Sequence, residues 1–254
     1  MRAEDYSYLY ELEESFWWFD GMREITAVLL DPLCPPAREG KMILDAGCGT
    51  GGNLSWLERY AGSGRVIGVD LVDDALRFCR ERKHELLARA SVTDLPFTDA
   101  VFDLVTSFDV LGQLPAEAAD ERAIREMYRV LKPGGICFVR VSAYEWMYSG
   151  HDSALGTRRR YSLAALSEKM ARVGFRLRRA TYANSLLLPA AALRRLALKP
   201  LGLADSGSDV KPLPRGLSWL NWLLVRALKS EARLLRRPHT RLSAGLSVIC
   251  MAEK

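Results

Sequence analysis

Residues 41–54 read Lys-Met-Ile-Leu-Asp-Ala-Gly-Cys-Gly-Thr-Gly-Gly-Asn-Leu: an apolar run that ends in Asp45, a glycine-rich loop, and the start of a helical pattern. Glycine is needed where the backbone takes a positive φ or approaches a ligand closely, so Gly47 and Gly49 indicate a tight turn after a strand. A carboxylate at that point repels a pyrophosphate but attracts an ammonium group, directly or through water. The stretch therefore predicts a strand, a turn and a helix around a ligand with a cationic group.

A second apolar strand, residues 65–70, also ends in an acid. Asp70 follows the glycine-rich loop by about 20 residues, the spacing at which an acid reaches ribose hydroxyls in a dinucleotide-type strand–helix–strand unit. A glycine triplet alone is weak evidence, whereas two strands that each end in an acid around the same loop are much stronger. Asp70 is therefore a candidate ribose ligand, and Asp45 a candidate partner for an ammonium group.

These features carry a family resemblance. Residues 45–51 resemble the first motif of class I S-adenosylmethionine-dependent methyltransferases, Asp70 matches their ribose-binding acid, and residues 91–97 are similar to their adenine-contacting segment. The resemblance implies S-adenosylmethionine as cofactor and S-adenosylhomocysteine as product, with the Asp94 carboxylate and the Leu95 amide on the adenine. The residues that it places at the cofactor are Asp45, Gly47, Gly49, Asn53, Asp70, Leu71, Thr93, Asp94, Leu95 and Phe108.

The fold that the resemblance implies is α/β: a Rossmann-like, doubly wound sheet of seven strands whose last strand is antiparallel. Apolar runs place the strands at residues 41–45, 65–70, 86–90, 101–108, 136–141, 174–182 and 247–252, and helical patterns lie at 4–30, 52–60, 72–84, 117–131, 163–173, 186–196 and 217–237,. We expect an N-terminal helical cap or lid over residues 1–36, the cofactor-binding core over 37–183 and 245–254, and a helical insertion over 184–244.

Composition bounds the class of protein. Of 254 residues, 49% are apolar, enough for a sizeable core,. Five scattered cysteines without a closely spaced pair argue against a zinc site or a disulfide framework, so we expect no metal and a reducing compartment,. The chain shows neither a signal-peptide pattern nor an apolar run long enough to span a bilayer,. These features predict a cytoplasmic protein, with peripheral contact at the inner face of the membrane if the insertion meets lipid.

Charge is distributed unevenly along the chain. Residues 1–150 hold 16 basic and 25 acidic side chains, a net charge of −9, whereas residues 151–254 hold 20 basic and 6 acidic, a net charge of +14. A basic half indicates an anionic partner, such as nucleic acid, a membrane surface or a phosphorylated substrate, unless it is only a solvated arginine-rich surface. Tryptophan and leucine beside the basic residues of the insertion leave three roles open: a lid, a homodimer surface, or a membrane-surface element.

The N-terminal segment packs four aromatic residues around Trp17 and Trp18. They are either core of a helix that caps the sheet or part of a lid, in which Trp18 covers the cofactor and Arg23 pairs with its methionine carboxylate. Similar segments occur in a bacterial branch of the family linked to cell-surface sugar, lipid or natural-product pathways.

Candidate substrate residues follow the fifth strand. The loop 142–152 is rich in polar and aromatic groups, so Tyr144 and Trp146 are expected to face the acceptor. His151 is the candidate general base, because histidine titrates in the right range, and Asp152 could orient it. Asp109 is the second candidate. Downstream, three residues could bind an anionic or glycosylated acceptor or simply begin a basic surface helix: Arg159, Arg160 and Tyr161.

The chain departs at two places from the bacterial branch that it resembles, and both bear on function. Relatives often carry Glu-His where this chain has Gly112 and Gln113, and a histidine where it has Thr157. Our leading hypothesis is methyl transfer to a hydroxyl oxygen of a small molecule, such as a natural product, a sugar or a lipid-linked intermediate. The missing histidines motivate an alternative, a cofactor-binding protein of the same fold without methyl transfer. Methyl transfer to nitrogen or to nucleic acid is a further alternative, which we do not favour because the chain lacks an Asn-Pro-Pro-Tyr-type motif.

Overall fold

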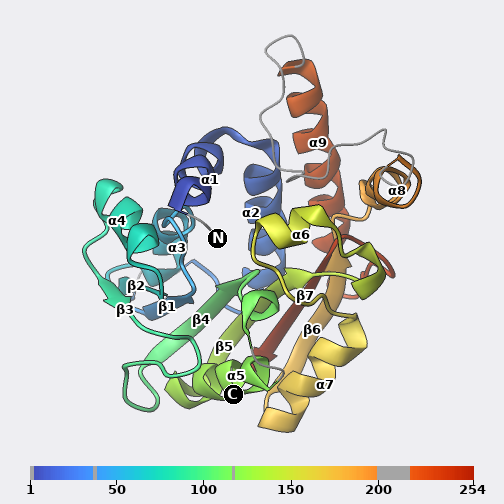
Figure 1. The fold of residues 1–254 in the computed structure, drawn as a ribbon. Helices are drawn as coiled ribbons and strands as arrows, with labels where there is room; N and C mark the ends of the chain where they lie inside the picture. The colour runs from blue at the N-terminus through green and yellow to red at the C-terminus, as the bar shows by residue number, and fades with distance from the viewer. Residues whose placement is uncertain (1–2, 37–38, 116–117, 199–217) are drawn as a thin grey trace.

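Seven strands form one sheet in the computed structural model of the chain, which describes residues 3–36, 39–115, 118–198 and 218–254 (Figure 1). The strand order is β3-β2-β1-β4-β5-β7-β6, and β7 runs antiparallel to both of its neighbours. The expected doubly wound sheet with an antiparallel last strand is therefore confirmed. The strands are β1 (Met42–Ala46), β2 (Arg65–Asp70), β3 (Leu87–Arg89), β4 (Phe102–Phe108), β5 (Leu131–Ser142), β6 (Arg176–Ala183) and β7 (Ser247–Glu253).

Helices cover both faces of this sheet (Figure 1). They are α1 (Ala3–Ser15), α2 (Trp17–Leu30), α3 (Leu54–Ala61), α4 (Asp73–Glu81), α5 (Ala119–Val130), α6 (Gly150–Ala154), α7 (Leu163–Val173), α8 (Leu188–Leu193) and α9 (Ser218–Leu235), with short turns η1 (Leu111–Gln113), η2 (Glu145–Met147) and η3 (Arg194–Leu198). Successive strand residues point to opposite faces. Leu44 and Val139 accordingly pack with α5 and α7 in one core, and Ile43 and Phe138 with α2, α3 and α9 in the other.

The N-terminal segment differs from expectation. A single helix over residues 4–30 is wrong, because the chain breaks at Phe16, which is buried and has extended backbone at φ −87° and ψ 128°. The break lets the two helices cover different surfaces. Helix α2 buries Ile25 against the sheet, whereas α1 packs on α4, where the rings of Tyr10 and Phe78 lie 5.0 Å apart.

The helical insertion packs on the N-terminal cap. Leu228 of α9 lies so close to Gly21 of α2 that a Cβ on this glycine would collide with it. The amide of Trp17 also donates to Asn221 Oδ1 at 3.2 Å. The helices expected at residues 186–196 and 217–237 are present as α8 with η3 and as α9. The polar connector predicted from Leu203 to Pro214 lies outside the described residues. In the described part of the chain, no helix combines the length and apolar character needed to cross a bilayer.

Candidate active site

The glycine-rich loop between β1 and α3 requires its glycines for two reasons. Gly47, Gly49 and Gly51 all have positive φ, at +87°, +55° and +84°, the region that side chains disfavour. A Cβ on Gly47 would also collide with the side chain of Val110. At Gly49, by contrast, no atom lies within 4 Å of where a Cβ would be. The loop thus leaves open space next to Gly49.

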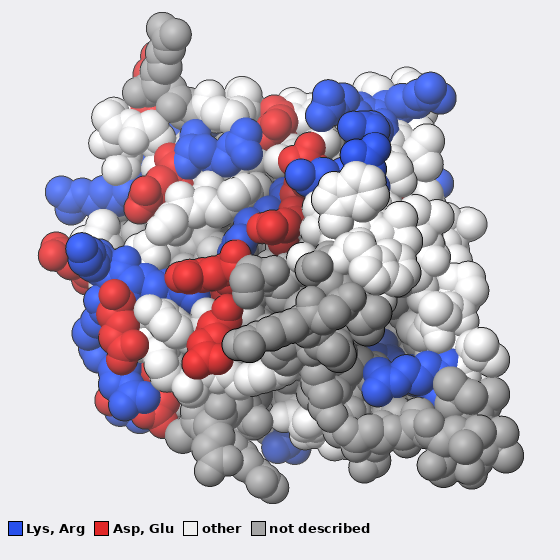
Figure 2. Space-filling model, turned by 90° about the horizontal axis from the view of Figure 1, so that it is seen from above, with Lys and Arg blue, Asp and Glu red and all other residues white. Residues whose placement is uncertain are grey.

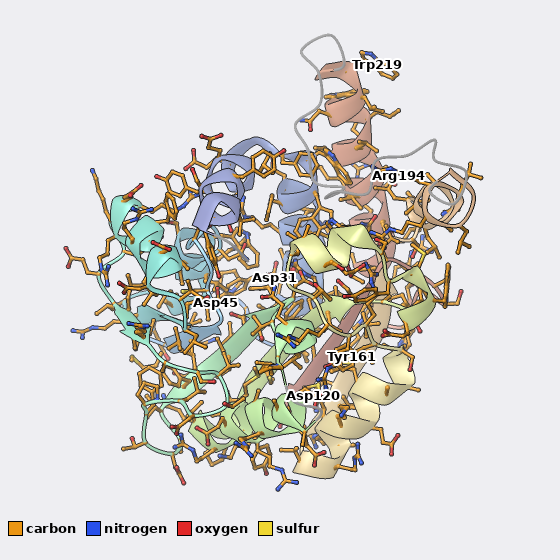
Figure 3. All side chains as sticks on the ribbon, in the orientation of Figure 1. Asp31, Asp45, Asp120, Tyr161, Arg194 and Trp219 are labelled. Atoms are coloured by element: carbon orange, nitrogen blue, oxygen red, sulfur yellow. The ribbon has the colours of Figure 1, made fainter. Side chains whose placement is uncertain are left out.

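Asp45 ends β1 directly before this loop, and Figure 3 shows it at that end of the sheet. Its side chain is only 1% exposed and accepts a hydrogen bond from the Thr106 hydroxyl at 2.8 Å. Burial raises the pKa of Asp45 to about 7, although the Thr106 hydrogen bond opposes the shift. No basic side chain of the described residues lies within ion-pair distance of this carboxyl group. The site therefore favours a ligand that brings a positive charge.

Asp70 ends β2 on the other side of the loop. Its Oδ2 accepts from the amide of Gly49 at 3.0 Å, and its Oδ1 accepts from the amide of Val72 at 2.9 Å. Burial raises the pKa of Asp70, and these amides act in the opposite direction. The two predicted acids are thus brought to one loop, with Asp70 bonded to it directly.

The predicted adenine segment needs one correction. The amide of Leu95, which was expected to donate to the adenine ring, donates instead to Glu126 Oε2 at 2.8 Å. Glu126 projects from α5, whose position relative to residue 95 is a tertiary feature. Asp94 is exposed rather than buried, and the hydroxyls of Thr93 and Ser91 are hydrogen-bonded to each other at 2.7 Å. The Leu95 amide is therefore not available to the adenine in this arrangement.

Leu71 completes this side of the loop. Its side chain is 60% exposed at the end of β2, which is ordinary for a single leucine on a protein surface. An adenine ring would cover such a side chain. The prediction that Leu71 contacts the cofactor stays a prediction.

The N-terminal helices reach the loop from above. Arg23 of α2 donates to the carbonyl of Gly52 at 2.8 Å and to Asn53 Oδ1 at 3.3 Å. Glu13 of α1 accepts from the Thr50 hydroxyl at 2.5 Å and is almost fully buried. Burial raises the pKa of Glu13, and the Thr50 hydrogen bond opposes this shift. Glu13 carried no sequence signal, since an acid in an acidic helix looks like a solvated one.

Arg140 contacts three residues that were predicted from the sequence, although Arg140 itself was not predicted. It is buried at the end of β5, and its guanidinium lies 4.7 Å from the ring centre of Trp18 and 4.9 Å from that of Phe108. Its Nη2 also lies 2.8 Å from Asp109 Oδ2. Asp109 has a positive φ of +62°, which is uncommon for a residue other than glycine,. An aspartate held by a buried arginine is occupied as an acceptor, which weakens its case as the general base.

The loop after β5 carries an aromatic stack. The ring of Tyr144 lies 5.5 Å from Trp146 and 5.1 Å from Tyr182, in stacked geometry with both. Trp146 is 53% exposed, so its ring is open to a ligand. Tyr182 was missed, because it lies on β6, far away in sequence. His151 follows in α6 and is half-buried.

Two predictions on this loop are wrong as stated, and a third loses support. Asp152 is already engaged by another partner: its Oδ1 accepts from Arg160 Nε at 2.7 Å, and both side chains are buried. Arg160 also donates to the carbonyl of Ala143 at 2.8 Å, so it holds the loop rather than facing a substrate. Tyr161 is a core residue, 4% exposed. Figure 3 shows it beside Asp120, well away from Asp45.

Arg159 is half-buried and also faces Asp120. Its Nη1 lies 3.7 Å from Asp120 Oδ2, and its Nη2 donates to the carbonyl of Leu114 at 3.3 Å. These contacts hold the segment before α7 against η1. They give Arg159 a structural role, and its contact with an acceptor stays a prediction.

We expect Tyr161→Phe to lower the free energy of unfolding by about 1.5–3 kcal/mol, the range for a hydrogen bond to a charged group. Its hydroxyl donates to the buried Asp120 Oδ2 at 2.8 Å, and the phenylalanine would leave that oxygen with one donor fewer. Urea unfolding measures the loss. Cofactor affinity should stay within twofold of the native value, and a large change in affinity would restore Tyr161 as a ligand-binding residue.

The two departures from the related sequences meet in space. The carbonyl of Gly112 accepts from the amide of Arg158 at 2.7 Å, and a Cβ on Gly112 would lie 2.8 Å from the carbonyl oxygen of Arg159. A larger residue at position 112 would therefore push the 157–160 segment away. The glycine and the altered downstream segment form one packing unit, which the sequence did not reveal.

The residues around the loop fit S-adenosylmethionine. Asp45 is a buried carboxyl group with no basic side chain of the described residues at ion-pair distance, since Arg140 acts on it only from farther away, and an ammonium group would supply a direct partner. The open space at Gly49 lies next to Asp70, as a ribose requires. Within the described ranges, no group of three His, Cys, Asp or Glu side chains is placed to hold a metal ion.

Comparison with known proteins agrees with this fit. Residues 44–139 match the family model of a methyltransferase domain. The chain is 37% identical over 101 residues to the fatty-acid O-methyltransferase of Mycolicibacterium smegmatis, covering 38% of this chain and 35% of that protein. It is 36% identical over 110 residues to UbiE of Enterobacter, a ubiquinone/menaquinone biosynthesis C-methyltransferase, covering 40% of this chain and 43% of that protein. An S-adenosylmethionine-dependent methyltransferase structure from Thermotoga maritima shares the fold, with a TM-score of 0.59 and 19% identity. The match covers 99% of this chain and 95% of that one.

The chain spans about half the length, or less, of the curated relatives it matches. The matched region contains the glycine-rich loop, Asp45 and Asp70, whereas the N-terminal helices and the α8–α9 insertion lie outside it. The similarity to a methyltransferase domain therefore covers the part of the chain that carries the glycine-rich loop and both acids.

Proposed function

We propose that the chain transfers a methyl group from S-adenosylmethionine to a hydroxyl oxygen of a small-molecule acceptor. The observation that carries this proposal is the pair of carboxyl groups on one glycine-rich loop. Asp45 is buried without an ion-pair partner among the described residues, and Asp70 is bonded to the amide of Gly49. An ammonium group and a ribose are the two parts of the cofactor that such a pair would recognise.

The cofactor, when bound, supplies an activated sulfonium methyl group, so much of the rate enhancement can come from alignment. Asp45 would hold the ammonium group and Asp70 the ribose. Arg23 lies at the same loop, where it donates to the carbonyl of Gly52 at 2.8 Å, and would bind the methionine carboxylate. Trp18 and Phe108, both against Arg140, would wall the site on the side of the reacting methyl group.

The acceptor would lie against the aromatic stack of Tyr144, Trp146 and Tyr182. The exposed ring of Trp146 offers an apolar surface for a lipid chain, an isoprenoid or a planar ring,. An oxygen acceptor is supported by the similarity to an enzyme named for O-methylation of fatty acids. Relatives named for C-methylation and for tRNA show that the domain alone does not set the acceptor.

The experiment that tests the proposal is turnover with isotope-labelled S-adenosylmethionine and a panel of fatty acids, isoprenoid alcohols, phenols and glycosides. Mass analysis would locate the methyl group on oxygen, nitrogen or carbon. Transfer to oxygen is the expected result. Methylation of carbon or nitrogen alone would refute the hydroxyl acceptor while leaving methyl transfer in place.

His151 is the proposed base. We expect His151→Asn to slow turnover about a hundredfold, the low end for general-base catalysis, because alignment supplies much of the rate. The rate of the native enzyme should rise with pH through the histidine range, and the variant should lose this pH-dependent rise. His239→Asn, at an exposed position after α9, serves as the control. An unchanged pH profile in the His151 variant would exclude it as the base.

A second candidate function is cofactor binding without methyl transfer. The observation that favours it is that both nearby aspartates, Asp109 and Asp152, are engaged by arginines. Cofactor binding by calorimetry, with no methylated product from any acceptor class, would support this candidate. Detection of one methylated product would remove it.

A further inference from the structure

The exposed face of α9 consists of an apolar tip followed by a basic stretch. Trp219, Trp222 and Leu223 are 60%, 59% and 48% exposed, and exposed basic residues such as Arg226 and Arg233 follow on the same helix. Figure 1 shows α9 extending farther from the sheet than the other helices, and Figure 3 places Trp219 at its end. The apolar residues thus sit where a flat surface would meet them first.

This tip is unusual for a solvated helix. Residues at spacings of three and four lie on one helical face, so Trp219, Trp222 and Leu223 form a contiguous patch. Single exposed apolar residues are ordinary, but a contiguous patch marks an interaction site. Tryptophan has an apolar ring with one polar N–H, which suits the boundary between water and lipid.

The charges on the insertion itself are mostly of one sign, although α2 beside it carries Glu24, whose Oε1 lies 3.9 Å from Arg236 Nη2. The described residues between 185 and 252 include eight lysines and arginines but a single acid, Glu231. Glu231 is buried, and it accepts from the amides of Asn184 and Ser185 at 2.5 and 2.7 Å. Figure 2, the view from above, shows basic and uncharged side chains toward α8, whereas acidic and basic ones are mixed on the opposite side. An anionic partner complements this surface.

The base of α9 is held firmly by the core. Arg179 of β6 donates to the carbonyls of Leu235, Arg237 and Thr240 at the end of the helix, at 2.5, 3.1 and 2.9 Å. Leu228 packs onto Gly21. The buried face therefore has a structural function already, which leaves the exposed face for another one.

We propose that α9 docks on an anionic phospholipid surface, with the Trp219–Leu223 tip in the boundary between headgroups and acyl chains. Interfacial helices bury their apolar side chains about 5–10 Å deep. Arg226 lies seven residues after Trp219, about 10 Å along the helix, and so would reach the phosphates when the tip is buried. Its guanidinium lies 4.5 Å from the ring of Trp222, which joins the basic and apolar parts.

Docking in this way would present the candidate active site to lipid. The tip of α9 lies on the side of the sheet at which the parallel strands end (Figure 1). Arg195 of η3 donates to the carbonyl of Met147 at 2.8 Å, linking the insertion to the loop that carries Trp146. A membrane-resident acceptor follows only if the proposed function holds, whereas the docking itself does not depend on it.

The test is sedimentation of the full chain with vesicles of phosphatidylcholine alone or of an equal mixture with phosphatidylglycerol. We expect binding to the mixed vesicles that weakens as salt is added. Trp219→Ser with Trp222→Ser should lower the partition coefficient at least tenfold. Arg226→Gln, Lys229→Gln and Arg233→Gln should each lower it about fivefold on anionic vesicles only.

Matched controls keep this test independent of folding and net charge. Arg77→Gln and Arg80→Gln on α4 remove the same kind of charge from exposed positions elsewhere and should leave vesicle binding unchanged. Circular dichroism checks that each variant is folded. Absence of binding to mixed vesicles, or equal losses in the α4 variants, would overturn the proposal. So would light scattering that shows a dimer dissociated by the tryptophan substitutions, since the tip would then bind a second copy. Each measurement is made without turnover, so its failure leaves methyl transfer untouched.

Discussion

In the Asp70→Ala variant, we expect the dissociation constant for S-adenosylmethionine to rise about a thousandfold. Hydrogen bonds that two ribose hydroxyls donate to a carboxylate contribute roughly 1.5–3 kcal/mol each, and about 4 kcal/mol in total corresponds to that factor. Asp70 also bonds the amides of Gly49 and Val72, so the substitution removes support from the loop itself. Isothermal titration calorimetry with S-adenosylmethionine and S-adenosylhomocysteine measures the change.

Asp73→Ala is the matched control for this measurement. Asp73 lies three residues further on at the start of α4, and its side chain is 66% exposed. It carries the same charge but contacts neither the loop nor the candidate site. The dissociation constant of the Asp73→Ala variant for S-adenosylmethionine should therefore stay within twofold of the native value. An Asp70 variant that binds the cofactor normally, in a protein shown to be folded by its melting curve, would contradict the assignment of the ribose site.

The sheet and the centre of the site could be predicted because their signals are local. The strand that ends in Asp45, the glycines that follow and the strand that ends in Asp70 lie within about 30 residues, and parallel strands bring their carboxyl ends to one edge. Positive φ at Gly47 and Gly49 is a backbone requirement that the residue type itself reveals,.

The surroundings of the site could not be predicted, because they depend on partners distant in the sequence. Arg160 looks like a substrate-binding arginine until Asp152 is found beside it in the interior. The Leu95 amide looks free until α5 brings Glu126 to it. A charged residue is solvated by default, and only the tertiary contact that neutralises it reveals that it is buried.

The missed residues follow the same rule. Glu13 and Arg140 are both charged and both buried, and each contacts residues that were identified from the sequence, Thr50 in one case and Asp109 in the other. Periodicity identifies apolar core positions but cannot assign a buried charge to a core. The site is therefore predictable where its chemistry resides in one motif and unpredictable where it is completed by packing.

Asp45→Asn should separate stability from cofactor binding. Burial raises the pKa of Asp45 from 3.8 in the unfolded chain to about 7 in the folded one. The folded state therefore holds the proton more tightly, and this contribution to stability is lost as the pH rises from 3.8 through 7. Ionised Asp45 costs the fold about 4 kcal/mol at pH 8 and above, an order of magnitude that follows from 1.36 kcal/mol per pKa unit.

Asparagine removes this cost and can still accept the hydrogen bond from the Thr106 hydroxyl, which in the native protein spans 2.8 Å. We therefore expect Asp45→Asn to raise the free energy of unfolding by up to about 4 kcal/mol near pH 8, with the gain shrinking toward pH 5. Urea unfolding at both pH values measures it, with Asp99→Asn, an exposed aspartate, as the control. A gain that does not depend on pH would refute the buried-charge explanation.

The same variant should bind S-adenosylmethionine about a hundredfold more weakly, because it loses a charged hydrogen bond to the ammonium group. In the native protein the ammonium group stabilises ionised Asp45, so binding below pH 7 must displace the proton. Affinity should then fall by up to about tenfold per pH unit below 7, and calorimetry in buffers of different ionisation enthalpy should detect the released proton. A more stable protein that binds its cofactor less well would show that the fold carries the cost of Asp45 for the sake of the ligand. Unchanged affinity in the variant would instead make Asp45 a structural residue of β1.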